Sequence, residues 1–123
     1  MPEVKVPGMT LTPALTTFDT TDAMRLGQWW AAALGGSVVD ENDGWFVIVK
    51  LPNEQLLAFQ KIDDPTPGKN RIHLDLTTAD VAGDVARLLD SGASKVADRE
   101  AGGFAWTTLA DPDGNQFCVS PEH

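Results

Sequence analysis

The chain carries the same succession of secondary-structure signals twice, and this duplication constrains its fold more than any other feature. In each copy a strand-like run leads through an aspartate into a helical run that ends at glycine, and three short strand-like runs follow. The offset is 58 residues from Asp22 to Asp80, 57 from Gly35 to Gly92 and 60 from Pro52 to Pro112. Neither unit can bury its hydrophobic face alone, so we expect the two units to be paired.

The repeat predicts two βαβββ modules. In the first, we expect strands at Leu11–Phe18, Val38–Val39, Trp45–Val49 and Leu56–Gln60, with a helix from Asp22 to the Gly35–Gly36 pair. In the second, we expect strands at Ile72–Thr77, Val96–Ala97, Phe104–Leu109 and Gln116–Val119, with a helix from Asp80 to Gly92. Aspartate is a favoured N-cap and glycine a favoured C-cap. The fold class is therefore α+β: two βαβββ modules that form a cupped, eight-stranded mixed sheet.

Each predicted helix has one apolar stripe at helical spacing, which should pack on a sheet. The stripe of the first helix consists of Ala23, Leu26, Trp30, Ala33 and Leu34. The stripe of the second consists of Val81, Val85, Leu88 and Leu89. With 123 residues, we expect a single domain over 1–123, with module one at 10–62, a linker at 63–70 and module two at 71–121. Pro65, Pro67 and Gly68 mark the linker.

Composition excludes several function classes. The net charge of −9 repels phosphate backbones, so nucleic acid is not expected as a partner, whereas cationic small molecules would be attracted. The same acidity also serves solubility, and both interpretations stay open. No apolar run approaches the roughly 20 residues that span a bilayer, and no secretory signal opens the chain, so we expect no membrane partner and a cytoplasmic location. Cys118 is the only cysteine, so no internal disulfide forms.

Period-two alternation assigns one face of the sheet to a ligand cavity. In the second module, Ile72, Leu74 and Leu76 form the apolar set and should face the helix. Arg71, His73, Asp75 and Thr77 should therefore point into the cup. The other residues expected to face the cup are Leu15, Thr17, Leu56, Ala58, Gln60, Trp106, Thr108, Gln116, Cys118 and Ser120, with Trp45 at its rim. A mainly apolar cavity with a few polar groups and aromatic walls is typical of a small-molecule pocket.

Two candidate residues allow more than one interpretation. His73 could act as a general base that Asp75 orients, but these two residues could equally be a polar cluster left from a metal-binding ancestor. Two strand residues on one face lie about 6–7 Å apart by backbone rise, so a direct contact is possible without being assured. Cys118 could be a nucleophile beside His73, or a small hydrophobic side chain with an inert thiol.

Several motifs resemble those of a known family. These are the run from Asp22 through Trp29 and Trp30 to Gly35, the strand Lys69–Leu76 and the turn Asp111-Pro112-Asp113-Gly114-Asn115. The chain resembles the vicinal oxygen chelate superfamily, in particular its glyoxalase-like, or glyoxalase/bleomycin-resistance-like, branch, from Leu11 to Ser120. The superfamily includes glyoxalase I, extradiol dioxygenases, fosfomycin-modifying enzymes and bleomycin-resistance proteins. The resemblance implies the glyoxalase/bleomycin resistance/dihydroxybiphenyl dioxygenase fold and a homodimer, but fold does not fix function.

Metal-dependent members of that superfamily place four ligands in the cup, one from the first and one from the fourth strand of each module. By this resemblance the positions fall on Leu15, on or next to Ala58, on His73 and on Cys118 of this chain. Only His73 is a ligand of the family type, so we expect no metal and no cofactor. A tightly held zinc or hard cation needs three or four donors, and His73 with Cys118 alone would bind a soft metal weakly.

We therefore expect a metal-free glyoxalase/bleomycin-resistance-like protein that binds an amphipathic or cationic small molecule, in its cup or in a dimer groove, with antibiotic resistance as a role. Bleomycin-resistance relatives sequester a cationic drug in dimer grooves. Two alternatives stay open, so the chain is not assigned as an enzyme or a non-enzyme. One is an isomerase or lyase with His73 as base, Asp75 as orienting residue and Arg71 holding an anionic substrate. The other is a metal-dependent member with unusual ligands. The candidate ligand-binding residues are Trp45, Gln60, Arg71, His73, Asp75, Trp106, Gln116 and Cys118.

Overall fold

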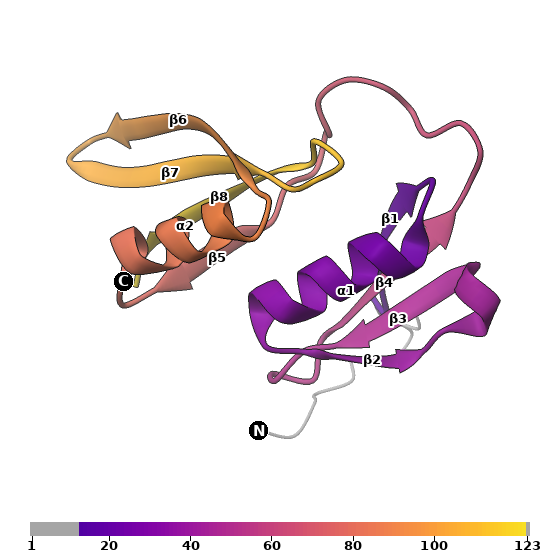
Figure 1. The fold of residues 1–123 in the computed structure, drawn as a ribbon. Helices are drawn as coiled ribbons and strands as arrows, with labels where there is room; N and C mark the ends of the chain where they lie inside the picture. The colour runs from indigo at the N-terminus through magenta and orange to yellow at the C-terminus, as the bar shows by residue number, and fades with distance from the viewer. Residues whose placement is uncertain (1–12, 123) are drawn as a thin grey trace, which may run out of the picture. The chain divides into compact units, whose positions relative to one another are not determined.

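The computed structural model describes residues 13–122 and contains the predicted element order twice (Figure 1). The first module consists of β1 (Thr16–Thr20), α1 (Ala23–Leu34), β2 (Ser37–Asp40), the 3-10 turn η1 (Asn42–Gly44), β3 (Phe46–Lys50) and β4 (Leu56–Lys61). The second consists of β5 (Asp75–Thr78), α2 (Val81–Asp90), β6 (Ser94–Ala101), β7 (Phe104–Ala110) and β8 (Gln116–Pro121). The predicted α+β class with two βαβββ modules is confirmed.

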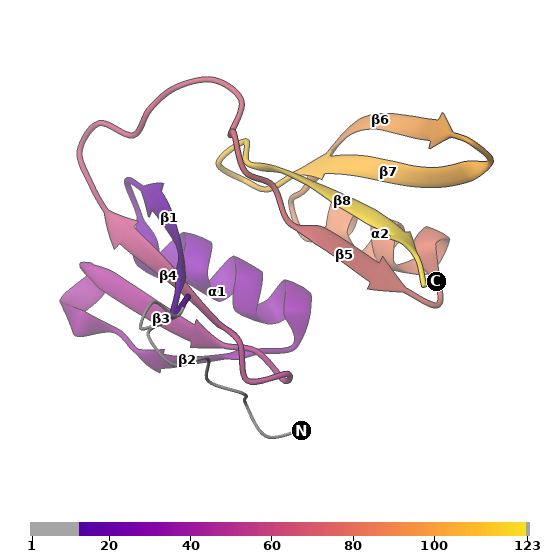
Figure 2. The same ribbon diagram turned by 180° about the vertical axis from the view of Figure 1, so that it is seen from behind.

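Each module forms one four-stranded mixed sheet with its helix on one face (Figures 1 and 2). The strand orders are β1-β4-β3-β2 and β5-β8-β7-β6, so the two sheets have the same topology. In each, the first and fourth strands are parallel and the other pairs antiparallel. The chain divides into two compact units between Lys61 and Ile62, and the cup shared by both modules stays a prediction.

Three of the four predicted helix caps are confirmed, whereas α2 has its C-cap at Ser91 and not at Gly92. The Asp22 carboxylate accepts a hydrogen bond from the Arg25 N–H at 3.1 Å, and Asp80 accepts one from the Gly83 N–H at 3.0 Å. At the other end of α1, Gly35 has a φ of 69°, a left-handed conformation that glycine adopts without steric cost. These contacts satisfy backbone groups that a helix terminus leaves unpaired.

The core of the first module lies between α1 and the middle of its sheet. Leu26 and Trp30 are completely or almost completely buried, as predicted, whereas Leu34 is only half-buried. Gly27 allows the helix to approach closely, because a Cβ at this position would lie 3.0 Å from Cγ1 of Val47. Phe18 completes the core by stacking on Phe59, with ring centroids 5.0 Å apart.

The core of the second module is smaller than the sequence predicts. Leu88 is the only buried residue of α2, and the buried apolar layer of the sheet consists of Leu109, Phe117 and Val119. Leu89, predicted to belong to the buried stripe, is 37% exposed. It lies in the last turn of α2, close to the end of the helix at Ser91.

The prediction that Ile72 faces the helix is wrong, because Ile72 is 82% exposed. The strand β5 begins at Asp75, so period-two alternation does not extend back to this residue. The segment is held instead by Asn70, whose Nδ2 donates to the carbonyls of Ile72 at 2.7 Å and Gln116 at 3.0 Å. Asn70, the last residue of the predicted linker at 63–70, is therefore bonded to the second module.

The predicted turn between β7 and β8 is confirmed and is built around Asp111. This aspartate is 3% exposed, and its Oδ1 accepts from the N–H groups of Asp113 and Asn115, each at 2.9 Å. Gly114 has a φ of 90°, which favours glycine, and donates its N–H to the Asp111 carbonyl.

Over residues 13–122, none of the helices combines the length and the apolar character that crossing a lipid bilayer requires.

Candidate functional site

The second sheet carries a hollow of about 660 Å³ on the face opposite its buried apolar layer. All of its walls come from the second module, with residues on β5, β6, β7 and β8 and on the segment leading into β5. The lining residues are Lys69, His73, Asp75, Thr77, Arg99, Phe104, Trp106, Thr108, Gln116, Cys118 and Ser120. This volume lies within the roughly 300–1,000 Å³ typical of small-molecule sites.

Strand alternation explains why these side chains converge. On β8, Gln116, Cys118 and Ser120 line the hollow, while Phe117 and Val119 between them are buried on the other side. The register aligns Asp75 with Cys118 and Cys118 with Thr108, so one row of side chains crosses three strands.

The lining of the hollow includes a contact between the two residues predicted as a catalytic pair. Nε2 of His73 lies 3.1 Å from Oδ1 of Asp75, so the direct contact that the sequence left open is present. Their side chains are 45% and 72% exposed, and the pair is therefore accessible from solvent. A carboxylate at this distance can fix the orientation of the imidazole.

Cys118 lies beside this pair at the centre of the sheet. Its N–H donates to the Leu74 carbonyl at 3.0 Å, and its Sγ lies 3.5 Å from Oγ1 of Thr108. One donor atom each of His73, Asp75 and Cys118 lies within 4.8 Å of the others. The hollow thus holds an imidazole, a carboxylate and a thiol close together.

One wall of the hollow is aromatic. Phe104 and Trp106 are two positions apart on β7, so both side chains lie on the face of the strand that lines the hollow. Their ring centroids are 6.1 Å apart and their planes are inclined by 31°. The sequence predicted Trp106 here but not Phe104. Such a pair offers a broad apolar surface on which a planar ring can stack.

The sequence analysis also missed Arg99, which lies across from Trp106 in the β6–β7 pair. Its Nε donates to Oγ1 of Thr108 at 2.9 Å, which holds the guanidinium over the hollow. The sequence feature that could have placed Arg99 on a strand is the Gly102-Gly103 pair. Two successive glycines between strand-like runs indicate a two-residue hairpin, and the residues before them then form a strand. Both glycines have positive φ, 58° and 79°, and the hairpin extends β6 to Ala101.

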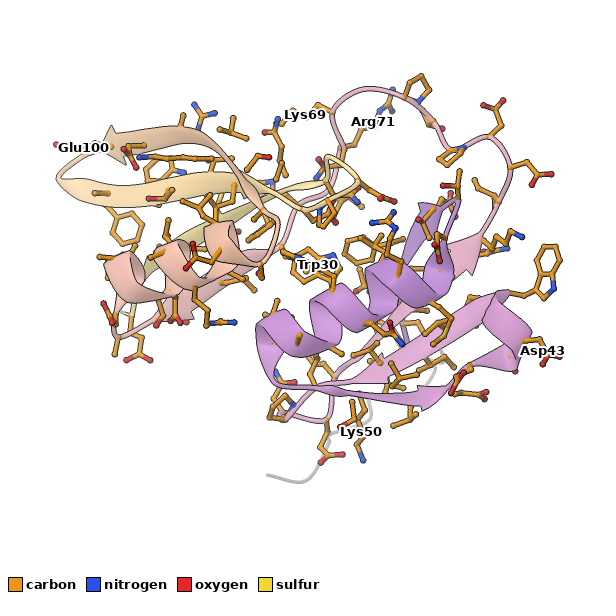
Figure 3. The ribbon with its side chains drawn as sticks, in the orientation of Figure 1. Trp30, Asp43, Lys50, Lys69, Arg71 and Glu100 are labelled. Carbon is orange, nitrogen blue, oxygen red and sulfur yellow. The ribbon has the colours of Figure 1, made fainter. Side chains whose placement is uncertain are left out.

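Three predicted site residues are not among those that line this hollow. Arg71 is exposed on the segment leading into β5, where Figure 3 labels it together with Lys69. Gln60 lies at an exposed position of β4 in the first module. Trp45 is also in the first module, is 61% exposed, and has the Lys61 ammonium 4.9 Å from its ring centroid. Their roles in a cup shared by both modules stay predictions.

The family of this chain follows from a match between its sequence and a protein-family model. Residues 16–120, which include all strands and helices except the last residue of β8, match the glyoxalase-like domain. The chain belongs to the glyoxalase-like domain family. The resemblance identified from the sequence is thereby confirmed. No curated protein matches the chain in sequence.

Solved structures from the same superfamily resemble this glyoxalase-like chain in fold. A glyoxalase/bleomycin resistance protein/dioxygenase family enzyme from Burkholderia phytofirmans has a TM-score of 0.75 at 15% identity, covering 88% of this chain and 96% of that one. The fosfomycin resistance protein of Listeria monocytogenes has a TM-score of 0.76 at 10% identity, covering 94% and 96%. An antibiotic-binding protein from Streptomyces has a TM-score of 0.68 at 20% identity, covering 94% and 99%.

The four-ligand metal centre implied by the superfamily does not fit this glyoxalase-like chain. Two of the four positions are Leu15 and Ala58, whose side chains have no donor atoms, and Ala58 is fully buried. The second module does offer a different set of three donors, His73, Asp75 and Cys118. Nitrogen, oxygen and sulfur donors of this kind are those that zinc accepts, so this cluster is a separate candidate.

Proposed function

We propose that this glyoxalase-like protein is a metal-free small-molecule-binding protein that holds an amphipathic ligand in the hollow of its second module without converting it. The aromatic wall formed by Phe104 and Trp106 is the observation that carries this proposal. It faces polar groups on β8 and at the start of β5, so one ligand can stack on the wall and form hydrogen bonds with the opposite side.

The structural neighbours support binding as a function of this fold. One of them is described as an antibiotic-binding protein and another as a fosfomycin resistance protein. We extend the first of these descriptions to this chain as part of the proposal, with a homodimer as the assembly and a groove between subunits as a second place for ligand. A role in antibiotic resistance would follow from sequestration of the compound.

A thermal-shift screen of aromatic metabolites and antibiotics tests the proposal. A ligand that binds only the native state stabilises it by about 2.7 kcal/mol at a hundred times its dissociation constant. Trp106→Ala should abolish most of that shift, because it removes half of the aromatic wall. The matched control is Val39→Ala, an exposed apolar residue of β2 that does not line the hollow. Equal shifts in both variants would argue against the hollow as the binding site.

The second candidate function is an isomerase or lyase, which the His73–Asp75 contact at 3.1 Å favours. In that case His73 would remove a proton from the substrate and Asp75 would stabilise the imidazolium that forms. His73→Ala discriminates between the two candidates once a ligand is known. A binding protein would lose about tenfold in affinity and show no turnover in either form. An enzyme would convert the ligand, detected by mass spectrometry, and His73→Ala would stop conversion while binding survives.

A further inference from the structure

The charge at the hollow is opposite in sign to the charge of the whole chain. Acidic side chains outnumber basic ones by 18 to 9, which gives a net charge of −9. Yet the hollow is lined by two permanent cations, Lys69 and Arg99, and by a single carboxylate, Asp75. With His73 neutral, these three groups leave one net positive charge at the hollow.

The guanidinium of Arg99 is held in place without an acidic partner. Its Nε donates to Thr108, which fixes the planar group beside the aromatic wall. The neighbouring acids Asp98 and Glu100 alternate to the other face of β6, where Asp98 pairs with Lys95 at 2.5 Å. Among the described residues no carboxylate pairs with Arg99, so its terminal amino groups can donate to a ligand.

A register shift in β6 is what brings Arg99 to this face. The pairing passes from Lys95 opposite Leu109 to Ala97 opposite Thr108, so Val96 is an extra residue on β6. A bulge of this kind re-aims the side chains that follow it. Beyond it, Arg99 pairs with Trp106 and Ala101 with Phe104, so the guanidinium and both rings share one face.

We propose that the hollow binds a planar aromatic molecule that carries an oxyanion, either a carboxylate or a phosphate, and that Arg99 binds this group. The inference rests on the proposed function and names its ligand class. Guanidinium donates two parallel hydrogen bonds to such an anion, a geometry that an ammonium cannot reproduce. Lys69 adds a second positive charge at the same hollow, and the rings of Phe104 and Trp106 receive the planar part of the ligand.

Isothermal titration with four compounds that share one ring system tests this inference. The probes are naphthoate, naphthyl phosphate, the neutral naphthamide and the cationic naphthylmethylammonium. We expect at least one anion to bind about tenfold or more tightly than the amide, and the cation to bind most weakly. The order of the carboxylate and the phosphate shows which oxyanion the site prefers.

Four variants locate the anion-binding group. Arg99→Gln should lower the affinity for the preferred anion about tenfold and leave the affinity for naphthamide unchanged. Arg99→Lys should restore part of the loss, since it keeps the charge but not the paired donors. Arg71→Gln tests the alternative in which Arg71 holds the anion, and a larger loss of anion affinity there than in Arg99→Gln would overturn the inference. Arg87→Gln, on the exposed side of α2, is the matched control.

Each remaining outcome decides the question. If Arg99→Gln does not fold, Lys69→Gln provides the test, because no hydrogen bond or ion pair of Lys69 occurs among the described residues and its loss should weaken the anion selectively. Equal affinities for anion and amide, or an unchanged anion affinity in Arg99→Gln, overturn the inference and leave the proposed function standing. Tightest binding by the ammonium overturns it in favour of a cationic ligand. If none of the four probes binds, this inference fails, and the thermal-shift screen of aromatic metabolites and antibiotics decides the proposed function separately.

Discussion

Asn70 and Gln116 are joined by two backbone-directed hydrogen bonds, although they lie 46 positions apart in the chain. Nδ2 of Asn70 donates to the Gln116 carbonyl at 3.0 Å, and its Oδ1 accepts from the Gln116 N–H at 2.8 Å. The amide thus takes the place of a strand partner for β8 before β5 begins. It also fixes the chain between Lys69 and His73, two of the residues that line the hollow.

Asn70→Ala should therefore destabilise the second module. It leaves partly buried backbone groups of Gln116 unpaired, which we expect to lower the free energy of unfolding by about 1–3 kcal/mol. Urea denaturation measures this loss, and Asn70→Asp, which keeps the acceptor but not the donor, should lose less. Amide hydrogen exchange at Gln116 should accelerate in the alanine variant. An unchanged exchange rate at Gln116 would show that the hydrogen bonds from the Asn70 side chain do not hold β8 in place.

Gly27→Ala should destabilise the first module although alanine favours a helix. The new Cβ would lie 3.0 Å from Cγ1 of Val47 and 3.3 Å from Cδ2 of Phe59, so these two buried side chains must each give by a few tenths of an ångström. Overpacking costs about 1–3 kcal/mol, whereas alanine gains at most about 1 kcal/mol in helix propensity. Val47→Ala alone is destabilising, but it should reduce the cost of Gly27→Ala in a double-mutant cycle. If the losses in unfolding free energy of the two single variants simply add in the double variant, Gly27 and Val47 are not closely packed against each other.

Asp98 should make the β6–β7 hairpin sensitive to acid. A hydrogen bond from Lys95, together with one from Thr107, lowers the pKa of Asp98 below its ordinary value of 3.8. Because the folded pKa is the lower one, the stabilisation is complete above 3.8 and disappears as the pH falls through the folded pKa. Asp98→Asn should thus lower Tm at neutral pH, and the difference from wild type should shrink in strong acid. A difference that grows in acid would contradict this assignment.

Metal analysis decides between the metal-free account and the cluster of His73, Asp75 and Cys118. Protein purified without chelator and then dialysed should contain far less than one equivalent of zinc, because no described residue completes a four-ligand set with these three. Addition of zinc should raise Tm weakly, and Cys118→Ser should remove that response. One tightly held equivalent of zinc, lost in Cys118→Ser, would replace the metal-free account with a metal site of unusual ligands.

The sequence predicted those parts of the structure that depend on local pattern. The caps at Asp22 and Asp80 and the turn at Asp111 follow from side-chain hydrogen bonds within a few residues, so they were identified correctly. Alternation on β8 likewise placed Cys118 in the hollow. The wrong orientation of Ile72 arose because alternation was extended beyond the strand.

The residues that the sequence did not predict depend on distant pairing. Arg99 lies in the polar run of β6, where no apolar alternation marks a strand, and the register shift at Val96 reverses the face on which it lies. Asn70 acts through a partner 46 positions away, which no local pattern reveals. Both assignments need the register of neighbouring strands, and only a three-dimensional structure supplies it.

An NMR titration of labelled protein with naphthoate tests the central claim most directly, because it locates the bound ligand on the chain. The account predicts shifts of the Trp106 indole N–H and of the backbone amides of Cys118 and Ser120, all of which belong to residues lining the hollow. Shifts confined to the first module, around Trp45 and Gln60, would contradict it.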